Sequence, residues 1–275
     1  MTELLANPFA LDAIGQTGEE RRFEVTAQAV RAYAEATDDD SPAAREGRIA
    51  PPVFAILPVW ETIAPASRSV ASVEARRRVV HYEQDMILHR PIEVGMKLIS
   101  RATPVALLAR TNGTSLVIRT ETETVDGEPV NSQFVTEFFR GVHTDVSRGE
   151  RPPGHRLDET AKAGATLKEI RFPISDDQTT RYAAASGDFF EIHLDDDAAR
   201  VSDYPVGSST ASAPWPSPAG PSSKPPAWTT PVQSRGSQCG FRLRFGLGAP
   251  SQHGSGHWTS RRSLASRRST PKDSS

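Results

Sequence analysis

An internal repeat constrains the fold of this chain more than any other feature of its sequence. The segment FEVTAQAVRAYAEATDD, which starts at Phe23, aligns without gaps with FPISDDQTTRYAAASGD, which starts at Phe172, at an offset of 149 residues. A phenylalanine, a hydroxyl residue suited to helix capping, a tyrosine and a final aspartate keep the same register. Two capped amphipathic helices can look alike by chance, but this shared register favours two copies of one fold, linked by the polar segment Thr144–Gly164.

The first copy combines helical and strand patterns. Apolar or small residues at helical spacing predict a helix within Phe23–Thr37, with Thr26 as its N-cap. The apolar stretch Pro51–Ile63 predicts a buried helix, with Pro58 at its start or at a kink. Four strands are expected, separated by turns at Gly95, Asn112-Gly113 and Asp126-Gly127: His81–His89, Met96–Leu108, Ser115–Val125 and Val130–Phe139. A long buried helix against an antiparallel meander predicts an α+β fold.

The composition changes near Pro205. After Asp203 no acidic residue occurs until Asp273, and Ser, Pro, Gly and Arg dominate. Too few apolar residues recur there to offset the loss of chain entropy on folding. Residues 206–275 are therefore predicted to be a disordered tail.

The bulk properties exclude several classes of protein. A net charge of -2 argues against a nucleic-acid-binding protein. The single cysteine excludes an internal disulfide framework and a multi-cysteine metal site. The first residues lack the pattern of a secretory signal, and no apolar stretch approaches the roughly 20 residues that span a bilayer. We expect a cytoplasmic protein without a membrane span, a metal or a cofactor of its own.

The segment Tyr182–Ala199 holds the residues best suited to chemistry. A helix is expected to end near Ser186-Gly187, because glycine tolerates the backbone conformation of a helix exit. Asp188 and His193 follow on a loop. A carboxylate and an imidazole held there can share one water molecule, so that one removes its proton and the other protonates the carbon next to a carbonyl. The alternative is a loop histidine beside a solvated acidic turn.

This segment resembles the signature of MaoC-like (R)-specific enoyl-CoA hydratases: an aromatic residue, small residues, Ser-Gly-Asp, a variable residue, Asn-Pro, an aliphatic residue, His, and an acid two positions on. The matching positions are Tyr182, Ser186, Gly187, Asp188, Ile192, His193 and Asp195. The resemblance implies a hot-dog fold, in which an antiparallel sheet wraps a long central helix. It also implies a lyase that interconverts trans-2-enoyl and (R)-3-hydroxyacyl thioesters in fatty acid metabolism.

The resemblance further implies that Asp188 and His193 are the catalytic pair, and we expect Ser186 and Gly187 to bind substrate. The substrate would carry coenzyme A or acyl carrier protein, and the chain would act as a homodimer. One departure is that Phe190-Glu191 replaces Asn-Pro, and phenylalanine cannot form the hydrogen bonds of the family's asparagine. This departure favours the alternative function, a non-catalytic hot-dog subunit that is structural or binds acyl groups.

The same resemblance divides the chain. Residues 1–150 are predicted to form a complete but degenerate hot dog, because Ala44 stands where the repeat would place the histidine. Residues 165–205 begin the catalytic copy, and residues 206–275 interrupt it. A reading-frame shift between Asp203 and Ser208 would explain the interruption, because the neighbouring frame of a plausible coding sequence reads ILHGLCTMAF. A genuine disordered extension is the alternative.

Overall fold

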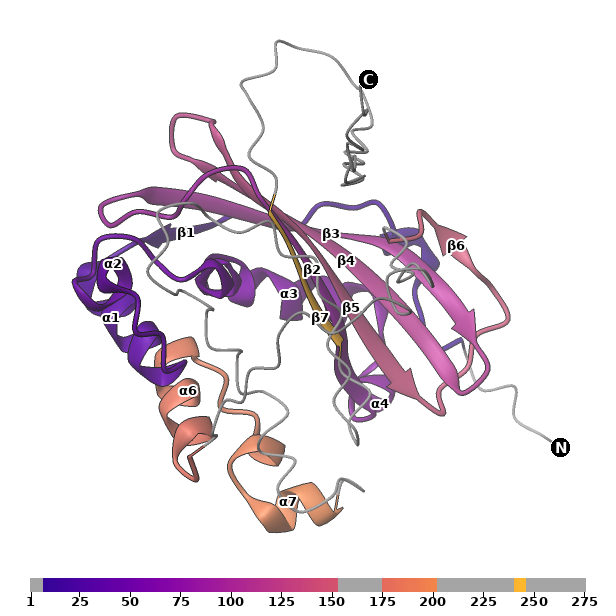
Figure 1. Cartoon of the computed structure of the whole chain (residues 1–275). Coiled ribbons are helices and arrows are strands. Elements are labelled where there is room, and N and C mark those ends of the chain that lie inside the picture. The colour runs from indigo at the N-terminus through magenta and orange to yellow at the C-terminus, as the bar shows by residue number, and fades with distance from the viewer. Residues whose placement is uncertain (1–6, 153–174, 202–239, 246–275) are drawn as a thin grey trace, which may run out of the picture.

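A twisted, mainly antiparallel sheet is the frame of the molecule (Figure 1). The computed structural model describes residues 7–152, 175–201 and 240–245. The strand order is β1-β3-β4-β5-β2-β7, and the short β6 pairs with β3. The strands are β1 (Arg21–Glu24), β2 (Val79–Leu88), β3 (Lys97–Arg110), β4 (Gly113–Thr124), β5 (Pro129–Arg140), β6 (Arg148–Gly149) and β7 (Gly240–Phe245).

The predicted meander is confirmed. Strands β3, β4 and β5 pair with their sequence neighbours, and β5 also pairs with β2. Arg110 lies opposite Gly113, so the tight turn is centred on Thr111 and Asn112, one residue earlier than the predicted Asn-Gly turn. Gly113 has a φ of 153°, and a Cβ there would lie 2.2 Å from the carbonyl oxygen of Phe139, which explains why glycine occupies this position.

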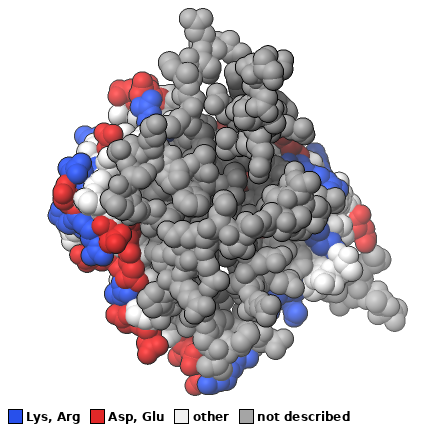
Figure 2. All heavy atoms as spheres, in the orientation of Figure 1, with Lys and Arg blue, Asp and Glu red and all other residues white. Residues whose placement is uncertain are grey.

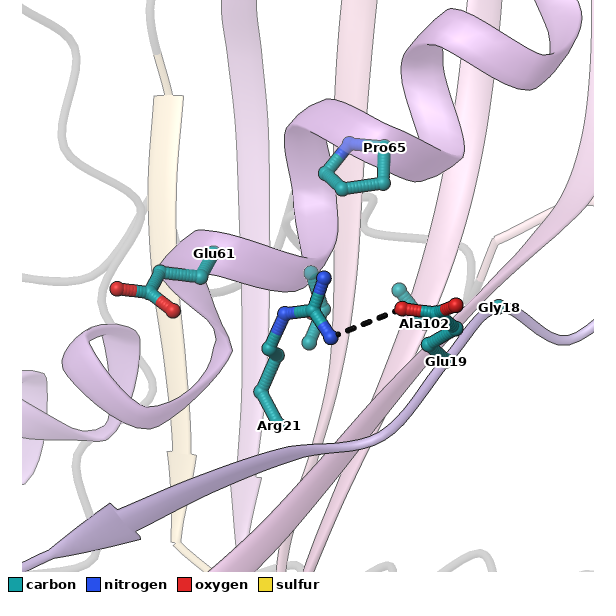
Figure 3. A pocket seen from close by; sticks show the side chains of 7 residues that line it. Gly18, Glu19, Arg21, Glu61, Pro65 and Ala102 are labelled. Atoms are coloured by element: carbon teal, nitrogen blue, oxygen red, sulfur yellow. Dashed lines mark hydrogen bonds and ion pairs between the residues drawn. The ribbon is translucent and has the colours of Figure 1, made fainter.

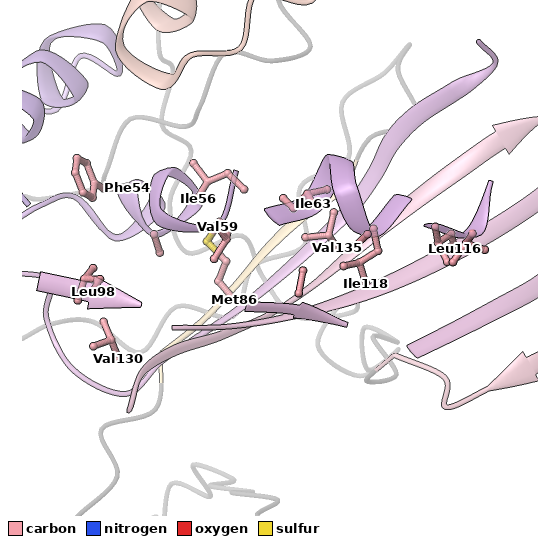
Figure 4. Packing of buried hydrophobic residues seen from close by; sticks show 14 of the residues in the cluster. Phe54, Ile56, Val59, Ile63, Met86, Leu98, Leu116, Ile118, Val130 and Val135 are labelled. Carbon is pink, nitrogen blue, oxygen red and sulfur yellow. The ribbon is translucent and has the colours of Figure 1, made fainter. Parts of the chain in front are cut away.

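The predicted buried helix is α3 (Leu57–Val70), preceded by the 3-10 helix η2 (Pro52–Ile56). Pro58 lies in the first turn of α3, where its missing N–H is tolerated, so it marks the start of the helix. Figure 4 shows apolar side chains of η2 and α3 facing those of the sheet, among them Val59 beside Met86 and Ile63 beside Val135. Each such side chain contributes about 1.5–3 kcal/mol when fully buried. The α+β arrangement of a helix wrapped by an antiparallel sheet is therefore as predicted.

The predicted capped helix is α1 (Ala27–Ala36). The Thr26 hydroxyl accepts a hydrogen bond from the Ala29 N–H at 3.1 Å, as expected for an N-cap. Short helices complete the first copy: η1 (Leu11–Ala13), α2 (Pro42–Arg45) and α4 (Val73–Arg76). The described part of the second copy consists of α6 (Gln178–Ser186), η3 (Glu191–His193) and α7 (Asp196–Val201).

Of the predicted tail, the structure describes Gly240–Phe245. This segment forms β7, which pairs in parallel with β2, whereas its composition predicted no regular structure. Its apolar residues alternate with arginines, which is typical of a strand. The run is too short to outweigh the surrounding composition, which predicted disorder. The rest of residues 206–275 and the proposed site of the frameshift lie outside the described residues.

Charged residues are mixed in sign on the described surface. Figure 2 shows acidic and basic side chains side by side along the margin of the molecule. Arg101, for example, lies between Glu20 and Glu123, at 2.8 Å and 2.7 Å. Exposed pairs of this kind contribute about 0–1 kcal/mol each.

Candidate active site

The exit of α6 has the geometry that its sequence predicted. Gly187 adopts the left-handed conformation, with a φ of 80°, and its N–H bonds to the Ala183 carbonyl at 2.9 Å. The Ser186 hydroxyl donates to the Tyr182 carbonyl at 2.8 Å and accepts from the Asp188 N–H at 3.2 Å. These contacts of Ser186 and Gly187 shape the loop. Their predicted role in substrate binding stays a prediction.

Asp188 and His193 lie on the loop that follows. The Asp188 carboxylate accepts a hydrogen bond from the Phe190 N–H at 3.3 Å, and the His193 N–H donates to the Phe190 carbonyl at 3.0 Å. The Phe190 and His193 rings are 6.2 Å apart. Asp195 caps α7, because its carboxylate accepts hydrogen bonds from two N–H groups of that helix. The two candidate catalytic side chains are both half-buried.

The first copy reproduces this local geometry at the repeat offset. The Asp39 carboxylate accepts from the Ser41 N–H at 2.9 Å, the same two-residue spacing that Asp188 uses. The short helix α2 begins at Pro42, whose counterpart at the offset is Glu191, the first residue of η3. Ala44 is buried where the second copy has His193. The repeat therefore extends from sequence into backbone structure.

The two copies contact each other through equivalent helices, α1 and α6 (Figure 1). Tyr33 and Tyr182, which are equivalent in the repeat, meet edge to face with ring centroids 5.9 Å apart. Arg181 pairs with Asp38 at 3.1 Å, and Gln178 donates to the same carboxylate at 3.0 Å. This interface fixes the position of the α6 exit loop relative to the first copy.

The ionisation of Tyr182 reflects its surroundings in this interface. Burial is the main cause that raises the pKa of Tyr182 to about 12. The contact with Tyr33 lowers this pKa, and the nearby Asp188 carboxylate raises it. The Ser186 hydroxyl links the two residues, because it donates to the Tyr182 carbonyl and accepts from the Asp188 N–H.

A third ionisable group, His81, lies on β2. Burial lowers the pKa of His81, and contact with Gln84 opposes this effect. The Asp188 carboxylate also raises the pKa of His81, whereas the His193 imidazole lowers it.

A small pocket of about 80 Å³ lies elsewhere, between β1, β3 and α3 (Figure 3). Arg21 reaches across it to Glu19, and Glu61 and Pro65 of α3 form another wall. It contains none of the predicted site residues, and its volume is below the ~300 Å³ typical of sites for organic ligands. Within the described ranges, no cluster of three metal-ligating side chains occurs. Nor is any helix there long and apolar enough to cross a membrane.

Comparison with known proteins identifies the fold of the chain. Residues 12–133 match the family described as FAS1-like, dehydratase domain region. A MaoC-like dehydratase from Phytophthora capsici has a TM-score of 0.57 and 18% identity, covering 71% of this chain and 70% of that chain. HtdX from Mycobacterium tuberculosis has a TM-score of 0.50 and 22% identity, covering 72% and 75%. At these identities the likeness shows the fold, which is the hot-dog fold of MaoC-like dehydratases.

Closer relatives give the family. A UPF0336 protein of Saccharopolyspora erythraea is 32% identical over 133 residues, covering 45% of this chain and 85% of that protein. A second UPF0336 protein, from a Parafrankia species, is 28% identical over 141 residues, covering 48% and 88%. The chain belongs to the UPF0336 family of MaoC-like hot-dog proteins. The predicted family resemblance and fold are thereby confirmed. The roles of Asp188 and His193 stay predictions.

Proposed function

We propose that this chain catalyses the reversible hydration of trans-2-enoyl thioesters to (R)-3-hydroxyacyl thioesters. The observation that carries the proposal is that Asp188 and His193 are both half-buried on the loop that leaves α6, the helix that packs against α1 of the first copy. A half-buried carboxylate and imidazole in this position are suited to general acid–base catalysis.

The chemistry requires two proton transfers. One group of the pair removes a proton from water, and the water oxygen forms a bond to carbon 3 as the carbon–carbon double bond becomes single. The other group delivers a proton to carbon 2, next to the thioester carbonyl. A water held between Asp188 and His193 would meet both requirements, and dehydration is the reverse path.

The loop also offers an apolar surface for an acyl chain. Phe189, Phe190 and Leu194 are 63%, 55% and 41% exposed, although large apolar side chains are usually buried. They flank Asp188 and His193 in sequence. Exposed apolar groups beside polar reactive groups suit a substrate with an apolar chain and a reactive head.

The proposed substrate also determines which cofactors the reaction needs. The thioester would supply coenzyme A or acyl carrier protein as its carrier, so the reaction needs no further cofactor or metal. We propose a cytoplasmic enzyme that acts on acyl thioesters in fatty acid metabolism, with a homodimer as its assembly.

The proposal is tested by hydration of crotonyl-CoA with the full chain. We expect measurable hydration that falls by roughly 10²–10⁴-fold in Asp188→Asn and in His193→Gln. Glu191→Gln is the matched control, because Glu191 is an exposed acid on the same loop and should keep the wild-type rate. Wild-type activity in His193→Gln would overturn the assigned role.

A second function is favoured by one observation. Phe190 replaces the asparagine of the family signature, and its ring contacts His193. An exposed aromatic ring can hold an acyl chain without supporting proton transfer, as in a non-catalytic acyl-binding subunit. Calorimetric binding of butyryl-CoA without turnover of crotonyl-CoA would support this second function over the first.

A further inference from the structure

The two copies differ at the ends of their equivalent helices, α1 and α6. A residue in the left-handed conformation follows each helix: Asp38 after α1, with a φ of 51°, and Gly187 after α6, with a φ of 80°. The two positions correspond in the repeat, because they are 149 residues apart. Among the described residues, Asp38 is the only one other than glycine whose φ is positive. An aspartate therefore stands in the first copy where glycine would fit the backbone with less strain.

The Asp38 carboxylate binds the second copy through both of its oxygens. Gln178 Nε2 donates to Oδ2 at 3.0 Å, and Arg181 Nη1 donates to Oδ1 at 3.1 Å. Both donors belong to α6, which lies beside α1 (Figure 1). Gly187, the counterpart of Asp38, has no side chain with which to return the contact. The polar part of this interface is thus asymmetric and is centred on one residue of the first copy.

Arg181 is held by its own copy while it contacts the first copy. Its Nε pairs with Asp177 at 3.2 Å, and its Nη2 donates to the Ser175 hydroxyl at 2.9 Å. Its Nη1 also donates to the Glu35 carbonyl in the last turn of α1, where the negative end of the helix favours a cation. Partners in both copies therefore fix the orientation of the guanidinium, and Asp38 is the one of opposite charge on the first copy.

The restraint on α6 extends to the candidate catalytic loop. This helix has nine residues, and the loop leaves it at Gly187. The Ser186 hydroxyl ties the last turn to the loop, because it bonds to the Tyr182 carbonyl and to the Asp188 N–H. The Asp188 carboxylate in turn accepts from the Phe190 N–H. A shift of this short helix would therefore displace Asp188, and a misplacement of about 1 Å can lower a catalytic rate by about 10²-fold.

We propose that Asp38, from the first copy, is a positioning residue for the Asp188–His193 pair of the second copy. The kinetic part of this inference rests on the proposed function, whereas the restraint on the loop is independent of activity. The side chains of Asp38 and Arg181 are 45% and 32% exposed, so water weakens their ion pair. Loss of the pair should therefore change the position of α6 more than it changes the stability of the whole chain.

The restraint is tested by hydrogen exchange in the full chain with Asp38→Gly. Glycine suits the left-handed backbone, so this variant removes the carboxylate without adding strain. Exchange of the Asp188 and Phe190 amides should become about fivefold faster, and that of the α3 amides should not change. Asp40→Asn is the matched control, because Asp40 is an exposed acid two residues further along and should keep the wild-type exchange rates. Wild-type exchange of both amides in Asp38→Gly would overturn the inference.

The role in catalysis is tested by crotonyl-CoA hydration with Asp38→Gly and Asp38→Asn. Asp38→Gly should lower kcat about tenfold and change KM less than twofold, as expected for a positioning residue. Asp38→Asn keeps one acceptor oxygen, so its kcat should fall less. The midpoint of thermal unfolding should shift by less than about 3 °C in both variants.

Two results would contradict this role: a wild-type kcat in Asp38→Gly, or a lower kcat that accompanies a larger fall in the unfolding midpoint. The second result would mean that Asp38 only stabilises the fold. If the wild-type chain shows no hydration while Asp38→Gly accelerates exchange of the loop amides, the proposed reaction fails but the restraint by Asp38 stands.

Discussion

At the scale of single residues, Glu137 is the partly buried acid with the clearest consequence for stability. Its carboxylate accepts a hydrogen bond from the Ser67 hydroxyl of α3 at 2.5 Å. Burial is the main cause that raises the pKa of Glu137 to about 7, against lowering contributions from Ser67 and Arg76. The folded state therefore prefers the protonated acid, whereas an unfolded chain ionises near pH 4.5.

This difference predicts how stability depends on pH. The contribution of Glu137 is fully present below pH 4.5 and is lost as pH rises through 7, because the unfolded state releases its proton first. The free energy of unfolding should fall by about 2–3 kcal/mol more between pH 5 and pH 8 in the wild type than in Glu137→Gln. Urea denaturation at the two pH values measures this. Parallel pH profiles of the two proteins would show that Glu137 is ionised in the fold.

At the scale of single elements, the exit of α6 depends on a glycine. Gly187 has a φ of 80°, and a Cβ built there meets nothing within 4 Å. The cost of a side chain at this position is therefore confined to the backbone conformation.

Gly187→Ala should destabilise α6 by about 1 kcal/mol, because a residue with a Cβ disfavours the left-handed region. Hydrogen exchange of the α6 amides should be faster, and that of the α3 amides unchanged. Gly95→Ala is the comparison, because Gly95 also has a positive φ of 92° with open space around it, but lies before β3. If both variants accelerate exchange in α6, the effect is not local to the helix exit.

The elements of the first copy could be predicted because their signals are local. Each signal determines the structure of residues next to it in the chain. Examples are the Thr26 cap, the apolar stretch that forms η2 and α3, and the glycine turns. The Asn-Gly turn was displaced by one residue, because strand pairing rather than the dipeptide alone sets the register. The strand β7 could not be predicted, because its pairing with β2 depends on a distant partner.

Only the local part of the candidate site could be predicted from the sequence. The loop with Asp188 and His193 follows from a contiguous motif and a glycine exit. The position of this loop beside the first copy depends on the tertiary contact of α1 with α6, which no local pattern encodes. Long-range placement of this kind comes from packing, and single-sequence patterns do not report it.

At the scale of the whole molecule, the described residues of the second copy are attached to the first mainly through the tyrosine pair and Asp38. Arg181 is partly exposed, so its ion pair contributes at most about 1 kcal/mol. The partly buried ring of Tyr182, which packs against the core, should contribute more, since aromatic rings bury large apolar areas.

Tyr182→Ala should therefore release α6 from the first copy while the sheet and α3 stay folded. Limited proteolysis should cut within residues 175–201 faster than in the wild type, and far-ultraviolet circular dichroism should change little. Tyr182→Phe keeps the ring contact and should stay resistant. Equal resistance of the alanine variant would mean that other contacts hold the second copy in place.

The central claim is that Asp188 and His193 act together on one water molecule. The most direct test is a double-variant cycle with Asp188→Asn, His193→Gln and both substitutions, assayed by initial rates of crotonyl-CoA hydration in the full chain. If the two groups act as a unit, the double variant should be about as slow as the slower single variant, because either loss already disables the pair. If the rate losses of the two single variants instead multiply in the double variant, the two groups act independently, and this result would contradict the account.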